Sequence, residues 1–467
     1  MRSRRVFFAA LFAATMSCGA AFAGSLRDTF PLGVYMSWHV CQENADAVGI
    51  SKDEYVDRLM ALVRRMNCDT VWVVNGPGKE APGFLECAER HGVKALLNSK
   101  LLRYCYEKMP KDESRLDSCA AESAATLGSS SAFLGYVLMD EPPTNMTQRL
   151  RRLEEVQHRH DPAHDSIMVV SPGQFPDYAE AMKFPAICAD IYYFGGPRSH
   201  GSIPTPAPVS RKLYRKKVRE MLDVGSRFGK NVWIMPQSFA EVRGPHYWDE
   251  SGRKCVVEKG AYIHWRMPTQ AEIRWQAWEA LRAGAKGIVF FALHGHHLRR
   301  REDMLPGGRD YEKLKKENAR LAELSKKMQE TETHEIDAER TLTYPGGAPT
   351  PQFAALGECF GKIAPHRVRL LSAQEDAECV LRTDDKMCAL NSFLDAKAGC
   401  HVGVIVNDDF EKENTFTVKV PDNVVRVSNL NGGPMPLSEK AGGFKSFAVC
   451  LSAGDDMLVE VVEDVRK

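Results

Sequence analysis

Short apolar runs alternate with amphipathic stretches from residue 31 to about residue 330. A continuous apolar run is typical of a parallel strand buried on both faces, and the amphipathic stretches are typical of the helices that cover it. Eight such runs therefore predict a (β/α)8 barrel. The candidate strands are Leu32 to Trp38, Thr70 to Asn75, Val93 to Asn98, Leu134 to Met139, Ser166 to Ser171, Ile187 to Tyr193, Val232 to Gln237 and Gly287 to Leu293.

An open, doubly wound sheet is the alternative to a closed barrel. Such a sheet more often carries a glycine-rich turn after its first strand, where this chain has Trp38-His39-Val40-Cys41. Helix signals lie between the runs: Ser51-Lys-Asp-Glu54 opens one amphipathic stretch as a capping box, and Pro268-Thr269 opens another. Residues 309 to 332, rich in Lys, Glu and Leu, are expected to form the last barrel helix.

Beyond about residue 335 the pattern changes to strict alternation. Phe416, Val418 and Val420 alternate with polar residues, and residues 401–407 and 447–461 form further strand-like runs between Gly-rich turns. This pattern predicts a C-terminal antiparallel β-sandwich. The expected organisation is a signal peptide over residues 1–23, a barrel over 24–334 and a β-sandwich over 335–467.

The amino terminus has the three parts of a secretory signal peptide. Arginines precede the apolar run Val6 to Met16, and Ala21-Phe22-Ala23 supplies a cleavage site. We expect a secreted or periplasmic protein. Lipid attachment at Cys18 is a weaker alternative, since Thr15-Met16-Ser17 is a poor lipobox. No later run approaches the roughly 20 apolar residues that cross a bilayer, so no membrane span is predicted.

Charge and cysteine content narrow the possible partners. Lysine plus arginine at 62 nearly cancels aspartate plus glutamate at 61, which leaves no basic surface for nucleic acid and favours a neutral ligand. Without Cys18, twelve of the 13 cysteines remain, an even number that permits disulfides in an oxidising compartment. Cys105 and Cys119 are one candidate pair. A set of free, buried thiols is an equally good interpretation.

Polar and aromatic side chains gather where the predicted strands end. The fourth strand ends on Asp140 and Glu141, and Pro142 stops it, so both carboxylates lie at the carboxyl end, where barrel enzymes carry their chemistry. Aromatic rings and carboxylates together are typical of a sugar site. The other strand-end candidates are Trp38, His39, Asn75, Asp190, Tyr192, Gln237 and His294.

A long loop over residues 240–267 adds further candidates. It carries Trp248 and Trp265 together with Glu241. A loop of this length inside a compact domain is usually functional, so we expect it to line the substrate cleft. The alternative is that its aromatic side chains only pack on the barrel rim.

These residues carry a family resemblance. The segments GYVLMDEP, ADIYYFGG and RMPTQAEIRWQAWEALRAGAKGIVFFAL, with the β-rich tail, resemble the clan A glycoside hydrolases and their less characterised bacterial relatives. The resemblance implies that Glu141 is the general acid/base, with Asp140 where that family usually has asparagine. The chain departs from the family at the seventh strand, which offers Pro236 or Gln237 in place of a nucleophilic glutamate, and after the eighth, where Leu293-His294 replaces a tryptophan.

Three mechanisms follow for a glycosidase built on these residues. Asp190 as base with Glu141 as acid gives inversion if the carboxyl groups are about 6.5 to 9.5 Å apart, and Glu241 as a displaced nucleophile needs about 5 to 5.5 Å. Alternatively Asp140 and Glu141 act together in substrate-assisted catalysis, as in the hexosaminidases that the pair resembles. In each case we expect the barrel mouth to desolvate Glu141 partly and keep it protonated near neutral pH.

The sequence thus predicts a secreted glycoside hydrolase that cleaves a neutral oligo- or polysaccharide. It predicts a carbohydrate ligand, no cofactor and no metal. A carbohydrate-binding pseudoenzyme is the alternative that the missing seventh-strand glutamate suggests. A metal-dependent hydrolase built around His294, His296 and His297 is the third, since closely spaced imidazoles are metal ligands.

Overall fold

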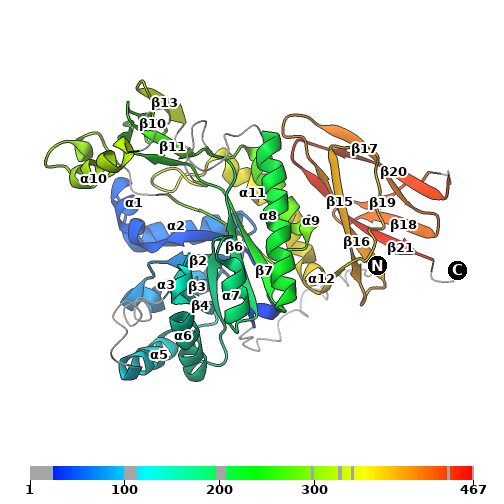
Figure 1. Ribbon diagram of the computed structural model, residues 1–467, viewed down its shortest axis with the longest axis horizontal. Coiled ribbons are helices and arrows are strands. Elements are labelled where there is room, and N and C mark those ends of the chain that lie inside the picture. Colours follow the sequence, from blue (N-terminus) through cyan, green and yellow to red (C-terminus); the bar gives the residue numbers. More distant parts are fainter. Residues whose placement is uncertain are drawn as a thin grey trace, which may run out of the picture.

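Eight parallel strands close a barrel in the computed structural model, which describes residues 25–98, 113–195, 207–295, 299–323, 329–337, 341–438 and 442–464. The strand order is β1-β12-β7-β6-β5-β4-β3-β2, and β12 pairs with β1 to complete the ring. Figure 1 shows strands of the barrel with helices around them. The predicted (β/α)8 barrel is confirmed, and the open sheet is excluded. The strands are β1 Leu32–Ser37, β2 Thr70–Val74, β3 Lys94–Leu97, β4 Phe133–Asp140, β5 Ser166–Val170, β6 Ala186–Ile191, β7 Asn231–Pro236 and β12 Ile288–Phe290.

Side chains, not solvent, fill the inside of the barrel. Trp72 and Trp233 are fully buried there, together with branched residues such as Ile167 and Val137. The strands are apolar on both faces because one face packs on this interior and the other on the helices.

Helices cover the outside of the barrel, as the amphipathic stretches predicted. Ser51 caps α2 by accepting a hydrogen bond from the Glu54 amide at 3.1 Å, and Thr269 with Glu272 forms a complete capping box at the start of α9. The helices up to α9 are α1 Cys41–Ala47, α2 Lys52–Arg65, α3 Ala81–Arg90, α5 Glu113–Leu127, α6 Thr147–His160, α7 Phe175–Ala181, α8 Ala207–Arg227 and α9 Gln270–Ala283.

A long excursion between β7 and α9 stands over the rim of the barrel. Its strands β8 Glu241–Arg243 and β11 Tyr262–Trp265 pair with each other, while β9 His246–Trp248 and β10 Lys254–Val257 pair and are extended by β13 His334–Asp337. Helix α10, Tyr311–Ala322, packs on the same excursion, because Leu321 lies against Gly244. The predicted loop is therefore a small antiparallel subdomain.

The prediction that residues 309–332 form the last barrel helix is wrong. That role belongs to α11, Pro351–Ile363, whose Phe360 ring lies 6.0 Å from Phe290 of β12 and whose Gly357 carbonyl accepts a hydrogen bond from Asn67 at 2.9 Å. The short helix α12, Arg367–Ser372, follows it. The domain boundary expected at residue 335 is thus misplaced, because the helical layer of the barrel runs on to about residue 372.

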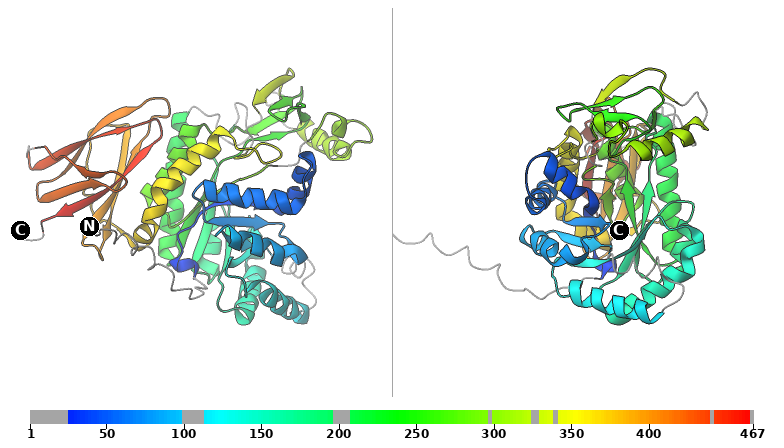
Figure 2. Two further views of the ribbon diagram at one scale, coloured as in Figure 1. Left: turned by 180° about the vertical axis from the view of Figure 1, so that it is seen from behind. Right: turned by 90° about the vertical axis from the view of Figure 1, so that its left-hand side faces the viewer.

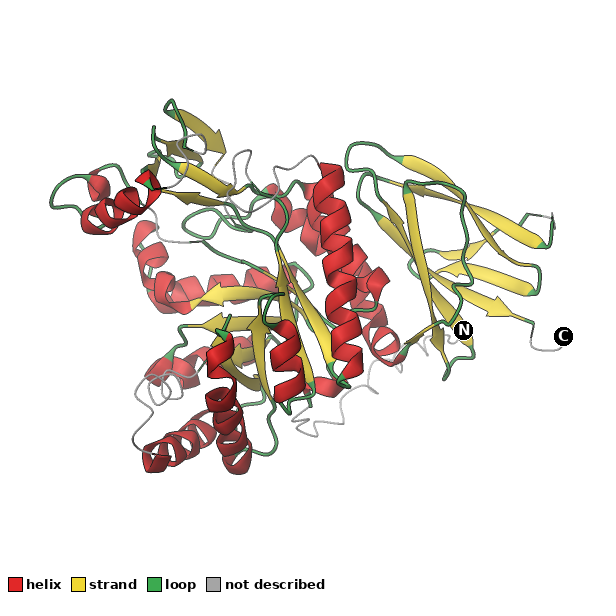
Figure 3. Cartoon of the chain, in the orientation of Figure 1, coloured by secondary structure: helices red, strands yellow, loops and turns green. Residues whose placement is uncertain are grey.

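The predicted C-terminal β-sandwich is confirmed (Figure 3). A six-stranded antiparallel sheet packs on the pair β17 and β20 around a core that includes Phe416, Val418 and Phe447. Strand β17 alternates between buried and exposed residues, as its sequence pattern predicted. The strands are β14 Gln374–Glu375, β15 Cys388–Asp395, β16 Cys400–Asn407, β17 Asn414–Pro421, β18 Val424–Asn429, β19 Gly433–Met435, β20 Phe444–Leu451 and β21 Asp456–Glu463.

Helices α8, α9 and α11 lie between the barrel strands and the sandwich (Figure 2). Val402 and Val404 of β16 belong to the same buried cluster as residues of α9, so the two domains share one core. At its edge the fully buried Glu279 of α9 binds Arg282 at 2.5 Å and Arg215 of α8 at 2.9 Å. Arg215 also binds Asp408, after β16, at 2.8 Å. This charge cluster joins the barrel to the sandwich.

The expectations about the signal peptide, the cysteines and a membrane span can be compared with the structure only for the described residues. The signal peptide, Cys18 and Cys105 lie outside the described residues. The cysteines of the described residues are free thiols, mostly buried, so the thiol interpretation holds for this part of the chain. No helix in the described part of the chain is long and apolar enough to cross a bilayer.

The charge cluster at the domain interface yields a stability prediction. Burial opposes ionisation of Glu279, but Arg282 and Arg215 outweigh it and lower its pKa. Glu279→Gln leaves both guanidinium groups short of a partner, and we expect the free energy of unfolding in urea to fall by about 2 kcal/mol at pH 7. Because the stabilising form of Glu279 is ionised, this loss should shrink as the pH falls below about 4.

Glu375→Gln is the matched control, because Glu375 forms an exposed ion pair with Arg219 at 2.6 Å. Such a pair contributes about 0 to 1 kcal/mol. Equal losses for the two substitutions would show that the buried cluster does not stabilise the interface.

Candidate active site

The fourth strand presents Asp140 and Glu141 at the carboxyl end of the barrel, as predicted. The Glu141 amide still donates to the Val169 carbonyl of β5 at 3.0 Å, but its φ of +43° turns the chain out of the strand. Asn75, directly after β2, has a φ of +50°. Residues other than glycine rarely adopt this left-handed backbone conformation. Those that do so concentrate at functional sites.

Asp190, at the end of β6, is the buried carboxyl group of the site. Its side chain is only 5% exposed, while that of Glu141 is exposed. Burial raises the pKa of Asp190 well above its usual range, and a side-chain hydrogen bond with Glu141 and the charge of Glu141 raise it further. The expected desolvation of Glu141 is therefore wrong: the desolvated carboxyl group is Asp190, which lies buried within β6, whereas Glu141 follows β4 in an exposed turn.

Two tyrosines complete this carboxyl group cluster. The Tyr35 hydroxyl of β1 donates to Asp140 Oδ2 at 2.9 Å. Burial, followed by the charges of Asp190, Glu141 and Asp140, raises the pKa of Tyr192 well above its usual range, so its hydroxyl keeps its proton. The site thus offers protonated hydroxyls beside three carboxyl groups.

Glu241 joins the site from the excursion rather than from a barrel strand. It lies half-buried on β8 and forms an ion pair with Arg243 at 3.2 Å. Glu141, Asp190 and Glu241 line one cavity of about 460 Å³, which we call the carboxylate cavity. Its other lining residues are Pro172, Ile191, Tyr192, Tyr193, Phe239, Trp265 and Phe291.

Aromatic rings form a continuous wall of the carboxylate cavity. The centroid of the Tyr192 ring lies 5.0 Å from that of Phe239, 5.9 Å from that of Phe291 and 6.3 Å from that of Trp265. Trp265 is half-buried, so part of its ring faces the cavity. Flat apolar surfaces beside carboxyl groups suit a sugar ring, whose faces are apolar and whose edge carries hydroxyls.

Asp190 and Glu141 are the two carboxyl groups of the site that influence each other most directly. They line the same cavity, and the charge of Glu141 raises the pKa of Asp190. Inversion by this pair requires about 6.5 to 9.5 Å between the carboxyl groups, a separation that admits a water molecule.

Two predicted substrate-binding residues do not reach the cavity. Gln237 is fully buried, accepts a hydrogen bond from the Phe194 amide at 3.0 Å and donates to the Arg266 carbonyl at 2.9 Å, so it fixes the chain around β7. Trp38 is 7% exposed, donates to Glu80 at 3.0 Å and packs edge-on against Phe84. Both assignments are corrected, because these side chains point into the packing of the rim.

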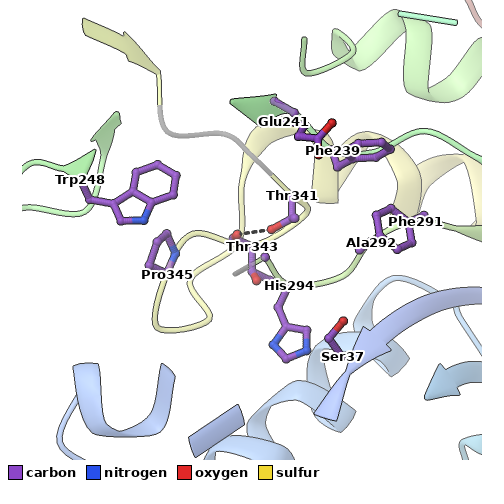
Figure 4. A pocket seen from close by; sticks show the side chains of 12 residues that line it. Ser37, Phe239, Glu241, Trp248, Phe291, Ala292, His294, Thr341, Thr343 and Pro345 are labelled. Carbon is purple, nitrogen blue, oxygen red and sulfur yellow. Dashed lines mark hydrogen bonds between the residues drawn. The ribbon is translucent and has the colours of Figure 1, made fainter. Parts of the chain in front are cut away.

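The remaining predicted residues lie around the mouth. His39 is exposed, and its Nδ1 atom lies 3.2 Å from Nδ2 of Asn75. His294 is 3% exposed, and burial lowers its pKa to about 4, so its ring is neutral at pH 7. His294 and the buried Trp248 line a second cavity beside the first (Figure 4).

Several site residues escaped the sequence analysis. Tyr35, Tyr193, Phe239 and Phe291 all line or support the cavities, but each lies in or beside an apolar run, where an aromatic residue looks like core. Alternation supplies the signal for Tyr35: on β1 it lies on the interior face, unlike its neighbours Val34 and Met36.

Within the described residues, neither cavity brings three potential metal ligands close enough together to hold an ion. His296 and His297 lie outside those residues, and His294 Nδ1 lies 3.3 Å from the Tyr55 hydroxyl. On the outer helices, Asp57, Cys87 and His91 place ligand atoms within 4.8 Å of one another. Arg90 binds the same Asp57 oxygen at 3.0 Å, so a guanidinium already occupies the charge-neutralising position there.

No family model and no curated protein matches the chain. The solved structures that it resembles include glycoside hydrolases. A noncanonical maltogenic α-amylase of Thermotoga neapolitana shares 12% identity, with 94% of this chain and 100% of that chain covered and a TM-score of 0.48. A structure described as a glycoside hydrolase shares 10%, with coverage of 89% and 90% and a TM-score of 0.47.

A β-glucuronidase of Ruminococcus gnavus shares 9% identity, with 66% of this chain covered and a TM-score of 0.41. The chain spans only 45% of that protein's length. Likenesses at these TM-scores carry no argument about substrate or mechanism.

The buried Asp190 yields a prediction about stability and pH. Because its pKa is raised, the folded protein holds a proton that the unfolded chain releases near pH 4, so Asp190 costs stability as the pH rises from about 4 towards the raised value. Asp190→Asn removes this cost. We expect the variant to gain stability over the wild type in urea unfolding between pH 5 and 8, by at most about 1.4 kcal/mol per pH unit.

Glu122→Gln is the control, because Glu122 is an exposed carboxylate on α5. Its difference from the wild type should stay constant over the same pH range. An advantage of Asp190→Asn that stays constant from pH 5 to 8 would mean that Asp190 is already ionised in the folded protein.

Proposed function

We propose that this protein hydrolyses O-glycosidic bonds of a neutral carbohydrate, with the proton-sharing pair of Glu141 and Asp190 as its acid. Their position in one cavity, where the charge of Glu141 raises the pKa of Asp190, carries the proposal. Two carboxyl groups that share a proton keep one of them neutral near pH 7, and glycoside cleavage needs a neutral acid beside the leaving oxygen.

The two members of the pair have different tasks. Glu141 is exposed to the cavity and can reach a bound substrate, while Asp190 lies beneath it. Glu141 donates the proton to the glycosidic oxygen, and Asp190 passes its own proton on through the hydrogen bond between them. Tyr35 holds Asp140, whose carboxylate faces the same mouth, so the substrate-assisted route through Asp140 and Glu141 is the alternative use of this acid.

Glu241 is the proposed second carboxylate. Strand β7 supplies no nucleophile, because it ends at Pro236 and Gln237 is buried. Glu241 lines the same cavity from β8 and forms an ion pair with Arg243. A second carboxylate in the cavity that holds the acid is what attack on an anomeric carbon, or stabilisation of its positive charge, requires.

Further parts of the proposal rest on the sequence. The signal peptide pattern of residues 1–23 supports export of the protein. A neutral substrate is supported by the balanced charge of the chain. The carbohydrate-binding pseudoenzyme is the second candidate function, and the absence of a glutamate at the end of β7 supports it.

The proposal predicts a leaving-group dependence for Glu141→Gln. Glutamine keeps the shape of the side chain but holds no transferable proton, so kcat on oligosaccharides should fall by about 10² to 10⁴. Aryl glycosides with an acidic phenol should suffer much less, because such a group departs as a stable anion. The measurement is kcat and KM on a panel of neutral oligosaccharides and their aryl glycosides.

Glu122→Gln serves again as the matched control and should leave both substrate classes unaffected. Comparable oligosaccharide turnover by Glu141→Gln and the wild type would remove Glu141 from the mechanism. Absence of turnover by the wild type on every glycoside, with retained binding, would support the pseudoenzyme.

A further inference from the structure

A second cavity of about 270 Å³ lies directly beside the carboxylate cavity, and we call it the apolar pocket (Figure 4). The two cavities share Phe239, Glu241 and Phe291 as lining residues, so they meet at the proposed second carboxylate. The other residues of the apolar pocket are Ser37, Ala240, Trp248, Ala292, His294, Gly295, Thr341, Thr343 and Pro345.

The walls of the apolar pocket come from three separate parts of the chain. Figure 4 shows Trp248 and Pro345 on one side, and Phe239 and Phe291 on the other. Trp248 belongs to the excursion, Pro345 to the segment between β13 and α11, and Phe291 directly follows β12 of the barrel. The pocket is thus bounded by flat and apolar side chains on opposing faces, a setting that suits a planar ring.

Both threonine hydroxyls of this pocket are already engaged within the protein. The Thr341 hydroxyl donates to the Thr343 carbonyl at 2.8 Å, and the Thr343 hydroxyl donates to the Leu293 carbonyl at 3.1 Å. His294 is neutral, with its ring beside Ser37, and its Nε2 atom is buried (Figure 4). A sugar hydroxyl directed at either threonine would lose its bond to water without regaining one, which disfavours a sugar ring on this side of the pocket.

We propose that the apolar pocket holds the leaving group of the substrate and that this leaving group is a compact aromatic alcohol. The inference rests on the proposed function and specifies its substrate class: a glycoside with its sugar in the carboxylate cavity and its aromatic aglycone in the apolar pocket. The glycosidic bond then lies at the junction, beside Glu241. In the reaction the C1–O bond breaks, the aryl oxygen takes a proton from the Glu141 and Asp190 pair, and water gives its hydroxide to C1 and its remaining proton to that pair.

Binding of 2-naphthol to the full-length protein tests the pocket without any need for catalysis. Isothermal titration should show one site per chain. Ala240→Leu fills the pocket with a larger side chain and should weaken 2-naphthol binding by at least about tenfold. Trp265→Ala, which alters the wall of the carboxylate cavity only, should change that affinity less than about twofold.

Pro345→Asp provides a second variant, because Pro345 is half-buried at the rim and tolerates substitution better than the buried Ala240. A carboxylate there should repel an apolar ring and also weaken 2-naphthol binding about tenfold. Thermal unfolding of each variant identifies those that remain folded. Undiminished binding of 2-naphthol to folded Pro345→Asp and Ala240→Leu proteins would overturn the assignment.

Turnover separates this inference from the proposed function. The ratio of kcat/KM for naphthyl glycosides to that for disaccharides of the same neutral hexoses should exceed one in the wild type and fall in Ala240→Leu. Turnover of disaccharides with no preference for the naphthyl glycosides would support the glycosidase function and contradict the aromatic leaving group. Site-specific 2-naphthol binding without turnover of any glycoside would support the assignment of the apolar pocket and contradict the glycosidase function.

Discussion

Closure of the parallel barrel is the constraint on which the rest of the structure depends. Parallel strands all end at the same rim, so Asp140 and Glu141 of β4 and Asp190 of β6 meet although 49 positions separate Glu141 from Asp190 in the sequence. The packed interior with Trp72 and Trp233 keeps that rim rigid. Glu141 and Asp190 line one cavity because the barrel fixes both strand ends.

Two buried acidic side chains, Glu279 and Asp190, differ in role because their charged neighbours differ. Glu279 is fully buried and its pKa is lowered, because Arg282 and Arg215 surround it with charge of the opposite sign. Asp190 is equally inaccessible and its pKa is raised, because its nearest ionisable partner is another carboxyl group. The first arrangement holds two domains together. The second costs stability and keeps a proton available at the mouth of a cavity.

The sequence predicted the strands and the rim carboxylates well because both depend on local signals: unbroken apolar runs, and polar residues where those runs stop. It failed where the outcome depends on side-chain direction or distant packing. Gln237 and Trp38 end strands as expected but turn into the rim. Helix α11 was assigned to the wrong domain, because the residues that tie it to the barrel, such as Phe290 and Asn67, lie far from it in the sequence. Desolvation of Asp190 rather than Glu141 depends on depth in the mouth, which no sequence pattern reports.

The pairing of β1 with β12 also has a consequence for how the chain folds during synthesis. Leu32 pairs with Ile288, and the covering helix α11 binds Asn67 only once Gly357 has been made. Contacts between residues so far apart form late and slowly. An incomplete chain therefore presents two open sheet edges, at β1 and at its last completed strand, until the eighth strand emerges. Those edges are the natural targets for chaperones and the points at which misassembly of this protein would begin.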